Sequence, residues 1–181
     1  MRFSLAALSA VAGLAIAGAV GIQAPALAQG QAHVGPQAMI NEHRVIERNL
    51  RAVAHEHGRV GIAAQHVLTV IVPHERHEEE FVLPLLGLVD SIVDSGVNQD
   101  MAWAVDMSNR VKADRASFTQ EHEKVVAALD ELATAARRQH DRRLVAFCES
   151  VAAHAVDDNE VVIPTAIVVG TLVAEKLGLK K

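Results

Sequence analysis

Aromatic and thiol side chains are scarce in this sequence. It holds no Tyr, one Trp, four Phe and one Cys among 181 residues. β-Sandwiches and β-barrels draw on aromatic and β-branched residues, so the composition disfavours an all-β fold, and its many Ala, Val, Leu and Glu residues favour packed helices. The lone Cys148 cannot form an intramolecular disulfide. The fold must therefore be stabilised by a hydrophobic core, which a domain of this length can bury.

Positive charge is scarce as well. Lys and Arg total 17 against 22 Asp and Glu, which gives a formal net charge of −5. A nucleic-acid-binding surface requires clustered Lys and Arg, so we expect no nucleic-acid partner. The sequence lacks the Cys-x-x-Cys-His motif of c-type haem, and no His has a Glu three residues before it, as ferritin-like di-iron sites require.

The N-terminal segment, residues 1–28, has the features of a Sec signal peptide. Arg2 precedes an uncharged Ala- and Leu-rich run over residues 5–21, and Ala26-Leu27-Ala28 matches a small-x-small cleavage site. The apolar run also reaches the ~18 residues at which an uncleaved membrane anchor is conceivable. We favour a cleaved signal peptide, followed by a flexible segment over residues 29–37. The protein is then exported, periplasmic or secreted, without stable membrane insertion after cleavage.

Apolar residues recur at helical spacing through residues 38–181 and predict a single all-α domain. The predicted long helices span residues 39–53, 62–88, 118–136 and 144–165. We expect Pro73 and Pro84 to kink or break the second of them. Residues 89–115 form a less regular segment with one further helix. Amphipathic helices with modest connections predict an antiparallel up-down four-helix bundle.

The sequence contains ten His residues, and four of them fall on the apolar stripes of different predicted helices. These four are His43, His74, His122 and His154. A carboxylate follows His74 and His154 by one helical turn on the same face, as Glu78 and Asp158. Unpaired imidazoles and carboxylates are costly in an apolar core, and a bound metal ion would satisfy them.

The pattern repeats along the chain. The set His74, Glu78 and Pro84 recurs with the same internal spacing as His154, Asp158 and Pro164, and His122 follows His43 at almost the same offset. A pseudo-two-fold repeat of a helix pair would bring four imidazoles and two carboxylates to the centre of the bundle. This donor set suits a dinuclear site for iron, manganese or zinc.

The residues from about 41 to 166 resemble the hemerythrin-like (HHE cation-binding) domain family. Its pattern is a His, a His-x-x-x-Glu before a Pro, a second single His, and a His-x-x-x-Glu/Asp before a Pro. The resemblance implies a non-haem di-iron centre that binds or senses O2, peroxide or nitric oxide, or handles iron. The implied metal ligands are His43, His74, Glu78, His122, His154 and Asp158.

Further carboxylates are candidates for the same site. Glu75 directly follows His74 and is an additional candidate ligand, because some members of the family carry a carboxylate beside the His of the second helix. Glu47 lies four residues after His43 and is a candidate ligand or a hydrogen-bond acceptor for a ligand His. Asp157 and Glu160 compete with Asp158, which helical phase favours.

The sequence departs from the oxygen carriers of the family at two places. Their third helix carries two ligand His residues four apart, but Phe118 and Val126 flank His122 at that spacing. Their last carboxylate lies five residues after its His, where this chain has Asn159. The resemblance therefore implies sensing or iron handling rather than reversible oxygen carriage.

Two alternatives to a ligand-binding protein remain open at this point. The same centre fits a di-iron enzyme that oxidises Fe(II) or consumes peroxide, as a ferroxidase or a peroxidase-like protein. The polar core also fits a structural bundle with incidental metal. Zn or Mn in place of iron is a further alternative.

Overall fold

The structure, a computed structural model, describes residues 33–179, which form helices and turns without a strand. The all-α prediction is confirmed for this part of the chain. The predicted signal peptide and residues 29–32 lie outside it. Over the same residues, no helix combines the length and apolar character that crossing a membrane requires.

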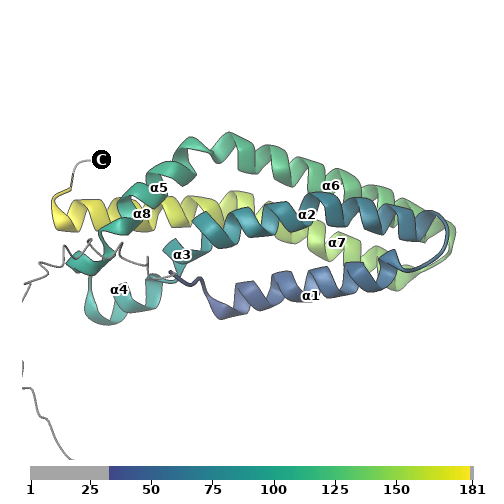
Figure 1. Ribbon diagram of the computed structural model, residues 1–181, viewed down its shortest axis with the longest axis horizontal. Coiled ribbons are helices and arrows are strands. Elements are labelled where there is room, and N and C mark those ends of the chain that lie inside the picture. The colour runs from purple at the N-terminus through teal and green to yellow at the C-terminus, as the bar shows by residue number, and fades with distance from the viewer. Residues whose placement is uncertain (1–32, 180–181) are drawn as a thin grey trace, which may run out of the picture. The chain divides into compact units, whose positions relative to one another are not determined.

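Four long helices pack side by side in the larger part of the molecule (Figure 1). They are α1 (Gln37–Ala54), α2 (Arg59–Phe81), α6 (Arg115–Arg138) and α7 (Arg142–Asp157). The α1–α2 and α6–α7 turns lie at the same end, and between α6 and α7 the Asp141 side chain accepts from the Arg143 and Leu144 amides at 3.0 Å. Each helix turns an apolar stripe inward, and Leu50, Val67 and Leu132 are fully buried there.

The single Cys148 lies in this core and is 1% exposed. Burial raises the pKa of its thiol to about 11, so the side chain stays protonated and unreactive at neutral pH. Cys148 therefore acts as a small apolar residue of this core.

A second core lies at the other end, where short helices connect α2 to α6. These are α3 (Leu83–Leu86), α4 (Val89–Ser95), the 3₁₀ turn η1 (Gln99–Met101) and α5 (Trp103–Ala113). The helix predicted for residues 62–88 is interrupted: α2 ends at Phe81 and Pro84 lies in the first turn of α3, where its missing N–H costs nothing. Pro73, by contrast, is accommodated inside α2.

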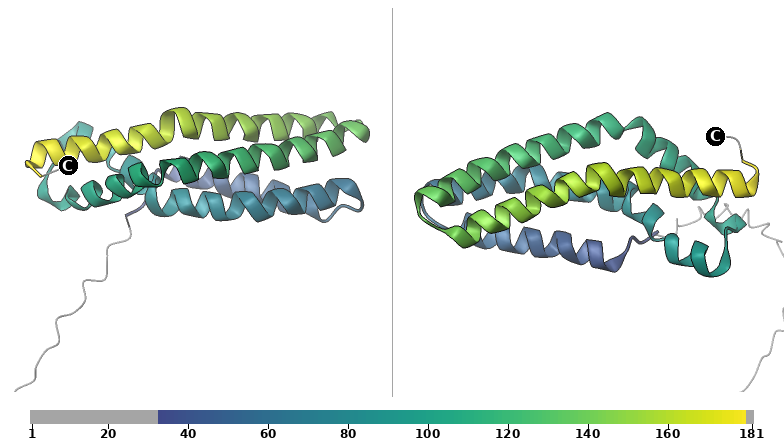
Figure 2. Two further views of the ribbon diagram at one scale, coloured as in Figure 1. Left: turned by 90° about the horizontal axis from the view of Figure 1, so that it is seen from above. Right: turned by 180° about the vertical axis from the view of Figure 1, so that it is seen from behind.

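The last helical segment extends well beyond residue 165. The chain passes from α7 through a π-helical turn, η2 (Asp158–Val162), into α8 (Ile163–Leu177), and the three segments run as one long rod (Figure 2). In the π turn the Ile163 amide bonds to the Asp158 carbonyl, five residues back. Pro164 falls in the first turn of α8, so the helix continues past it.

Helix α5 packs closely on α8 because Gly170 has no side chain. A Cβ atom at this position would overlap the side chain of Ser108 and crowd the Ala104 carbonyl. The described N-terminal residues also pack at this end, where the His33 ring stacks on Trp103 at 3.6 Å between centroids. This end of the molecule is thus built on the direct packing of α5 against α8.

We therefore expect Gly170→Ala to destabilise the metal-free protein by about 1–3 kcal/mol, because the extra methyl group forces α5 and α8 apart. Val168→Ala, at a position that is 63% exposed on the same helix, is the matched control and should change stability by about 0.5 kcal/mol or less. Urea denaturation measures both. Equal stability of the two variants would contradict the close α5–α8 packing.

Candidate metal centre

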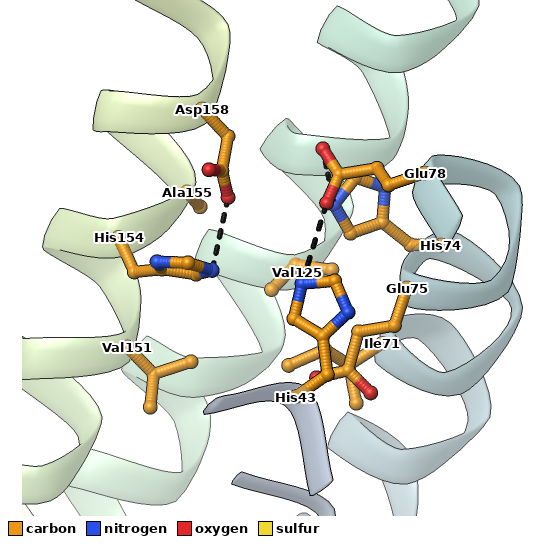
Figure 3. A pocket seen from close by; sticks show the side chains of 10 residues that line it. All are labelled: His43, Ile71, His74, Glu75, Glu78, Val125, Val151, His154, Ala155 and Asp158. Atoms are coloured by element: carbon orange, nitrogen blue, oxygen red, sulfur yellow. Dashed lines mark ion pairs between the residues drawn. The ribbon is translucent and has the colours of Figure 1, made fainter. Parts of the chain in front are cut away.

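The structure brings together the six residues that the sequence nominates. His43 comes from α1, His74 and Glu78 from α2, His122 from α6, His154 from α7 and Asp158 from the start of η2. All except His154 are at most 4% exposed, and the side chain of His154 is 20% exposed. Figure 3 shows His43, His74, His154 and the two carboxylates pointing toward one another around a small cavity.

Glu78 lies at the centre of this group. Its Oε1 lies 3.6 Å from Nε2 of His74 and 3.5 Å from Nε2 of His122. Its Oε2 lies 3.7 Å from Nε2 of His43. The carboxylate thus turns one oxygen toward two imidazoles and the other toward a third.

The imidazoles fall into two pairs. The ring centroids of His74 and His122 are 4.3 Å apart, and those of His43 and His154 are 5.9 Å apart. Oδ2 of Asp158 lies 3.1 Å from Nε2 of His154. One ligand atom each of His74, Glu78 and His122 lies within 4.8 Å of the others, so this buried group could hold a metal ion.

Several buried polar atoms at the site have no hydrogen-bond partner in the described part of the chain. They are Oε1 of Glu78, both ring nitrogens of His122, Nε2 of His154 and both carboxylate oxygens of Glu75. An unsatisfied buried polar group costs about 1–3 kcal/mol, and native cores retain few of them. Imidazole nitrogens and carboxylate oxygens are common ligands of divalent transition metals, so these residues fit a metal ion.

Three carboxylates outside the central group each lie near the Nδ1 atom of a different candidate ligand His. Nδ1 of His43 lies 3.1 Å from Glu79, and Nδ1 of His74 lies 3.2 Å from Glu121. Glu42 lies 3.7 Å from Nδ1 of His154. A carboxylate on Nδ1 fixes the tautomer that leaves Nε2 free for a metal.

The sequence analysis missed these outer carboxylates. A signal for two of them was present, because Glu42 and Glu121 directly precede His43 and His122, the candidate ligands at equivalent points of the two repeats. Each of the two instead faces an imidazole on another helix. Glu121 also accepts from His77 at 3.1 Å, which places His77 beside the site but outside the central group.

The additional candidates lie in different surroundings. Glu75 lines the central cavity and is 3% exposed. Glu47 is half-buried, does not line this cavity, and pairs with Arg51 at 2.8 Å. Asp157 and Glu160 are exposed, whereas Asp158 is 2% exposed.

The site's electrostatics follow from burial and close charges. Burial lowers the pKa of both His74 and His154, so the two imidazoles are neutral and available as ligands at neutral pH. Burial opposes ionisation of Glu78, but the imidazoles of His122, His74 and His43 outweigh it and hold its pKa below the ordinary value. Glu78 is therefore an anion in the protein interior.

The other buried carboxyls behave in the opposite way. Burial, reinforced by the Glu78 charge, raises the pKa of Asp158 to about 8. Burial also raises the pKa of Glu75 to about 9, with further contributions from Glu47 and Glu79. Without a cation, the cavity accepts the negative charge of Glu78 and disfavours two more. A divalent cation would relieve this repulsion.

Comparisons with protein-family models, with curated proteins and with solved structures found no match for this chain.

We expect the metal-free protein to lose stability as the pH rises from 7 to 9. In this window the unfolded chain has released the protons of both carboxyls, whereas the folded chain keeps them until about pH 8 at Asp158 and about pH 9 at Glu75. The folded state binds more protons, so the free energy of unfolding falls with pH. The buried His74 and His154 titrate below this window.

Urea denaturation at several pH values measures the slope. Glu75→Gln should flatten it, because the amide does not ionise. Glu56→Gln, at an exposed position in the α1–α2 turn, is the control and should keep the parent slope. The same slope in the Glu75→Gln variant and in the parent would contradict the pKa of Glu75.

Proposed function

We propose that this chain is a hemerythrin-like four-helix bundle that holds two iron ions in its core. The observation that carries the proposal is the geometry of Glu78, whose two oxygens lie against different imidazoles in a buried group. A carboxylate in this position can bridge two ions. The unpartnered nitrogens and oxygens around it support a bound cation.

The paired imidazoles support two metal positions. His74 and His122, with Oε1 of Glu78, would hold the first ion. The second would lie between His43, His154 and Asp158, with Oε2 of Glu78 shared. Glu75 borders the same cavity and is an additional candidate ligand.

The arrangement of the pairs supports the pseudo-two-fold organisation. Each position combines the single His of one sequence repeat with the His-carboxylate helix of the other: His122 on α6 faces α2, and His43 on α1 faces α7. Neither repeat contains a complete position by itself. In the proposed up-down bundle, the two repeats would come together around both ions.

These residues leave room for a small exogenous ligand. Each position has three or four protein donor atoms in this geometry, fewer than the six of an octahedral iron ion. The cavity is small, about 10 Å³, and the apolar side chains of Ile71, Val125 and Val151 line it beside the candidate ligands. Two iron ions would supply the chemistry that binds O2, peroxide or nitric oxide. We propose that this happens in an exported protein after removal of the signal peptide.

Metal content tests the dinuclear site. Mature protein loaded anaerobically with Fe(II) and desalted should retain about two irons per chain, and the His74→Ala, His154→Ala double variant far fewer, because each position loses an imidazole. His122→Ala should retain about one. His66→Ala removes an exposed His paired with Glu131 and should retain two.

Circular dichroism checks that each variant is folded. Parent protein that retains one ion or none would contradict the dinuclear site. Competition with Zn and Mn identifies the preferred metal.

The iron-loaded protein should change its absorption spectrum on exposure to O2, peroxide or nitric oxide, because these ligands reach the open coordination positions. Chelation should lower the thermal stability, because a metal ion at a free concentration of 100 times its Kd stabilises the folded state by about 2.7 kcal/mol. Unchanged thermal stability would favour a structural bundle with incidental metal. Sustained peroxide consumption would instead indicate an enzyme, and a spectrum insensitive to all three ligands would contradict the proposed binding.

A further inference from the structure

A cleft of about 400 Å³ lies between α6 and the α7–η2 rod and reaches the buried centre. Its wall includes Thr119, His122, Glu123, Val156, Asn159 and Glu160. His122 is 4% exposed, and neither of its ring nitrogens has a hydrogen-bond partner among the described residues. The same imidazole therefore borders an open cleft and belongs to the candidate metal group.

The charged side chains that line this cleft are all acidic. They are Glu123 and Glu160, both exposed, and neither forms an ion pair within the described part of the chain. Oδ1 of Asn159 accepts from Thr119 at 3.1 Å, and these two side chains add further oxygen atoms to the wall of the cleft. Carboxylate, amide and hydroxyl oxygens interact favourably with hydrated divalent cations.

A second cleft of similar volume borders the centre between α2 and α6, but its properties are less suited to a cation. Lys124 contributes a positive charge to its wall. The candidate ligand there is His74, whose Nδ1 is engaged by Glu121 at 3.2 Å, while its Nε2 faces Glu78. Glu121 is itself engaged by His77.

His122 differs from the other three imidazoles in its outer partner. His43, His74 and His154 each have a carboxylate near Nδ1, but His122 has none among the described residues. The reason lies in the repeat: Asn159 occupies the place in the second repeat that Glu79, the carboxylate facing His43, occupies in the first. The ring of His122 is therefore held by fewer polar contacts than the other three imidazoles.

We propose that the α6–α7 cleft is the route by which a divalent metal ion enters the centre. Glu123 and Glu160 attract the hydrated ion, and His122 is the first buried ligand that it meets. This inference rests on the proposed metal centre, and it concerns the rate of metal uptake rather than the equilibrium affinity. Two carboxylates at a mouth speed the arrival of a dication by electrostatic attraction, which salt screens.

The test follows anaerobic Co²⁺ uptake by absorbance in stopped flow. The Glu123→Gln, Glu160→Gln variant should take up Co²⁺ about three- to tenfold more slowly at low salt, with the same final metal content as the parent. The difference should shrink at high salt. Glu56→Gln, Glu175→Gln changes the net charge equally at exposed sites on other elements and should keep the parent rate.

A steric test uses one obstruction in each cleft. Ala127→Trp places an indole at an exposed position in the wall of the α6–α7 cleft and should slow uptake. Thr69→Trp does the same in the α2–α6 cleft and should leave the rate unchanged. Because both positions are exposed, both variants should fold, which circular dichroism checks.

Equal uptake rates in the parent and the Glu123→Gln, Glu160→Gln variant would overturn the proposed route, as would slowing by Thr69→Trp but not by Ala127→Trp. Reduced final metal content at an unchanged rate would also overturn it. Parent protein that takes up neither Co²⁺ nor Fe(II) contradicts the metal centre itself. Failure of the route and failure of the proposed function are therefore distinguishable.

Discussion

The structure depends on a buried carboxylate, Glu78, surrounded by imidazoles from three other positions in the fold. Its side chain is 1% exposed, yet its pKa is held below the ordinary value, so it carries a negative charge inside a helical core. A buried charge is tolerated only when partners compensate for its lost hydration. The partners come from α1, α2 and α6, and this requirement fixes the rotation of each helix about its own axis.

The duplicated sequence pattern produces a centre whose two sides are unequal. Glu75 lines the cavity, and its equivalent in the second repeat is Ala155, which lines it too but brings no polar atom. Glu79 faces His43, and its counterpart Asn159 bonds to Thr119 instead. The repeat thus supplies the shared scaffold, while these two substitutions make one side rich in carboxylates and the other open to a cleft.

The central group was predictable from the sequence, whereas its outer partners were not. His74 and Glu78 lie one helical turn apart, so the sequence alone places them on one face. Glu121 and Glu42 reach imidazoles on other helices, and such pairs depend on how the helices are rotated and offset, which spacing within one helix does not encode. The π turn was not foreseen for a different reason, since a Pro signals a disturbed helix but does not indicate a π turn before it.

That π turn connects the architecture to the site. Asp158 is its first residue, so His154 and Asp158 still share one face at normal helical spacing, with 3.1 Å between Nε2 of His154 and Oδ2 of Asp158. The extra residue then changes the phase of the rod beyond Asp158. Asn159 turns toward Thr119 on α6, and Pro164 falls where no amide is required. π turns are rare within α-helices and often occur at functional sites. Here the π turn begins at the buried carboxylate, lies directly before Pro164, and contributes Asn159 and Glu160 to the wall of the cleft beside His122.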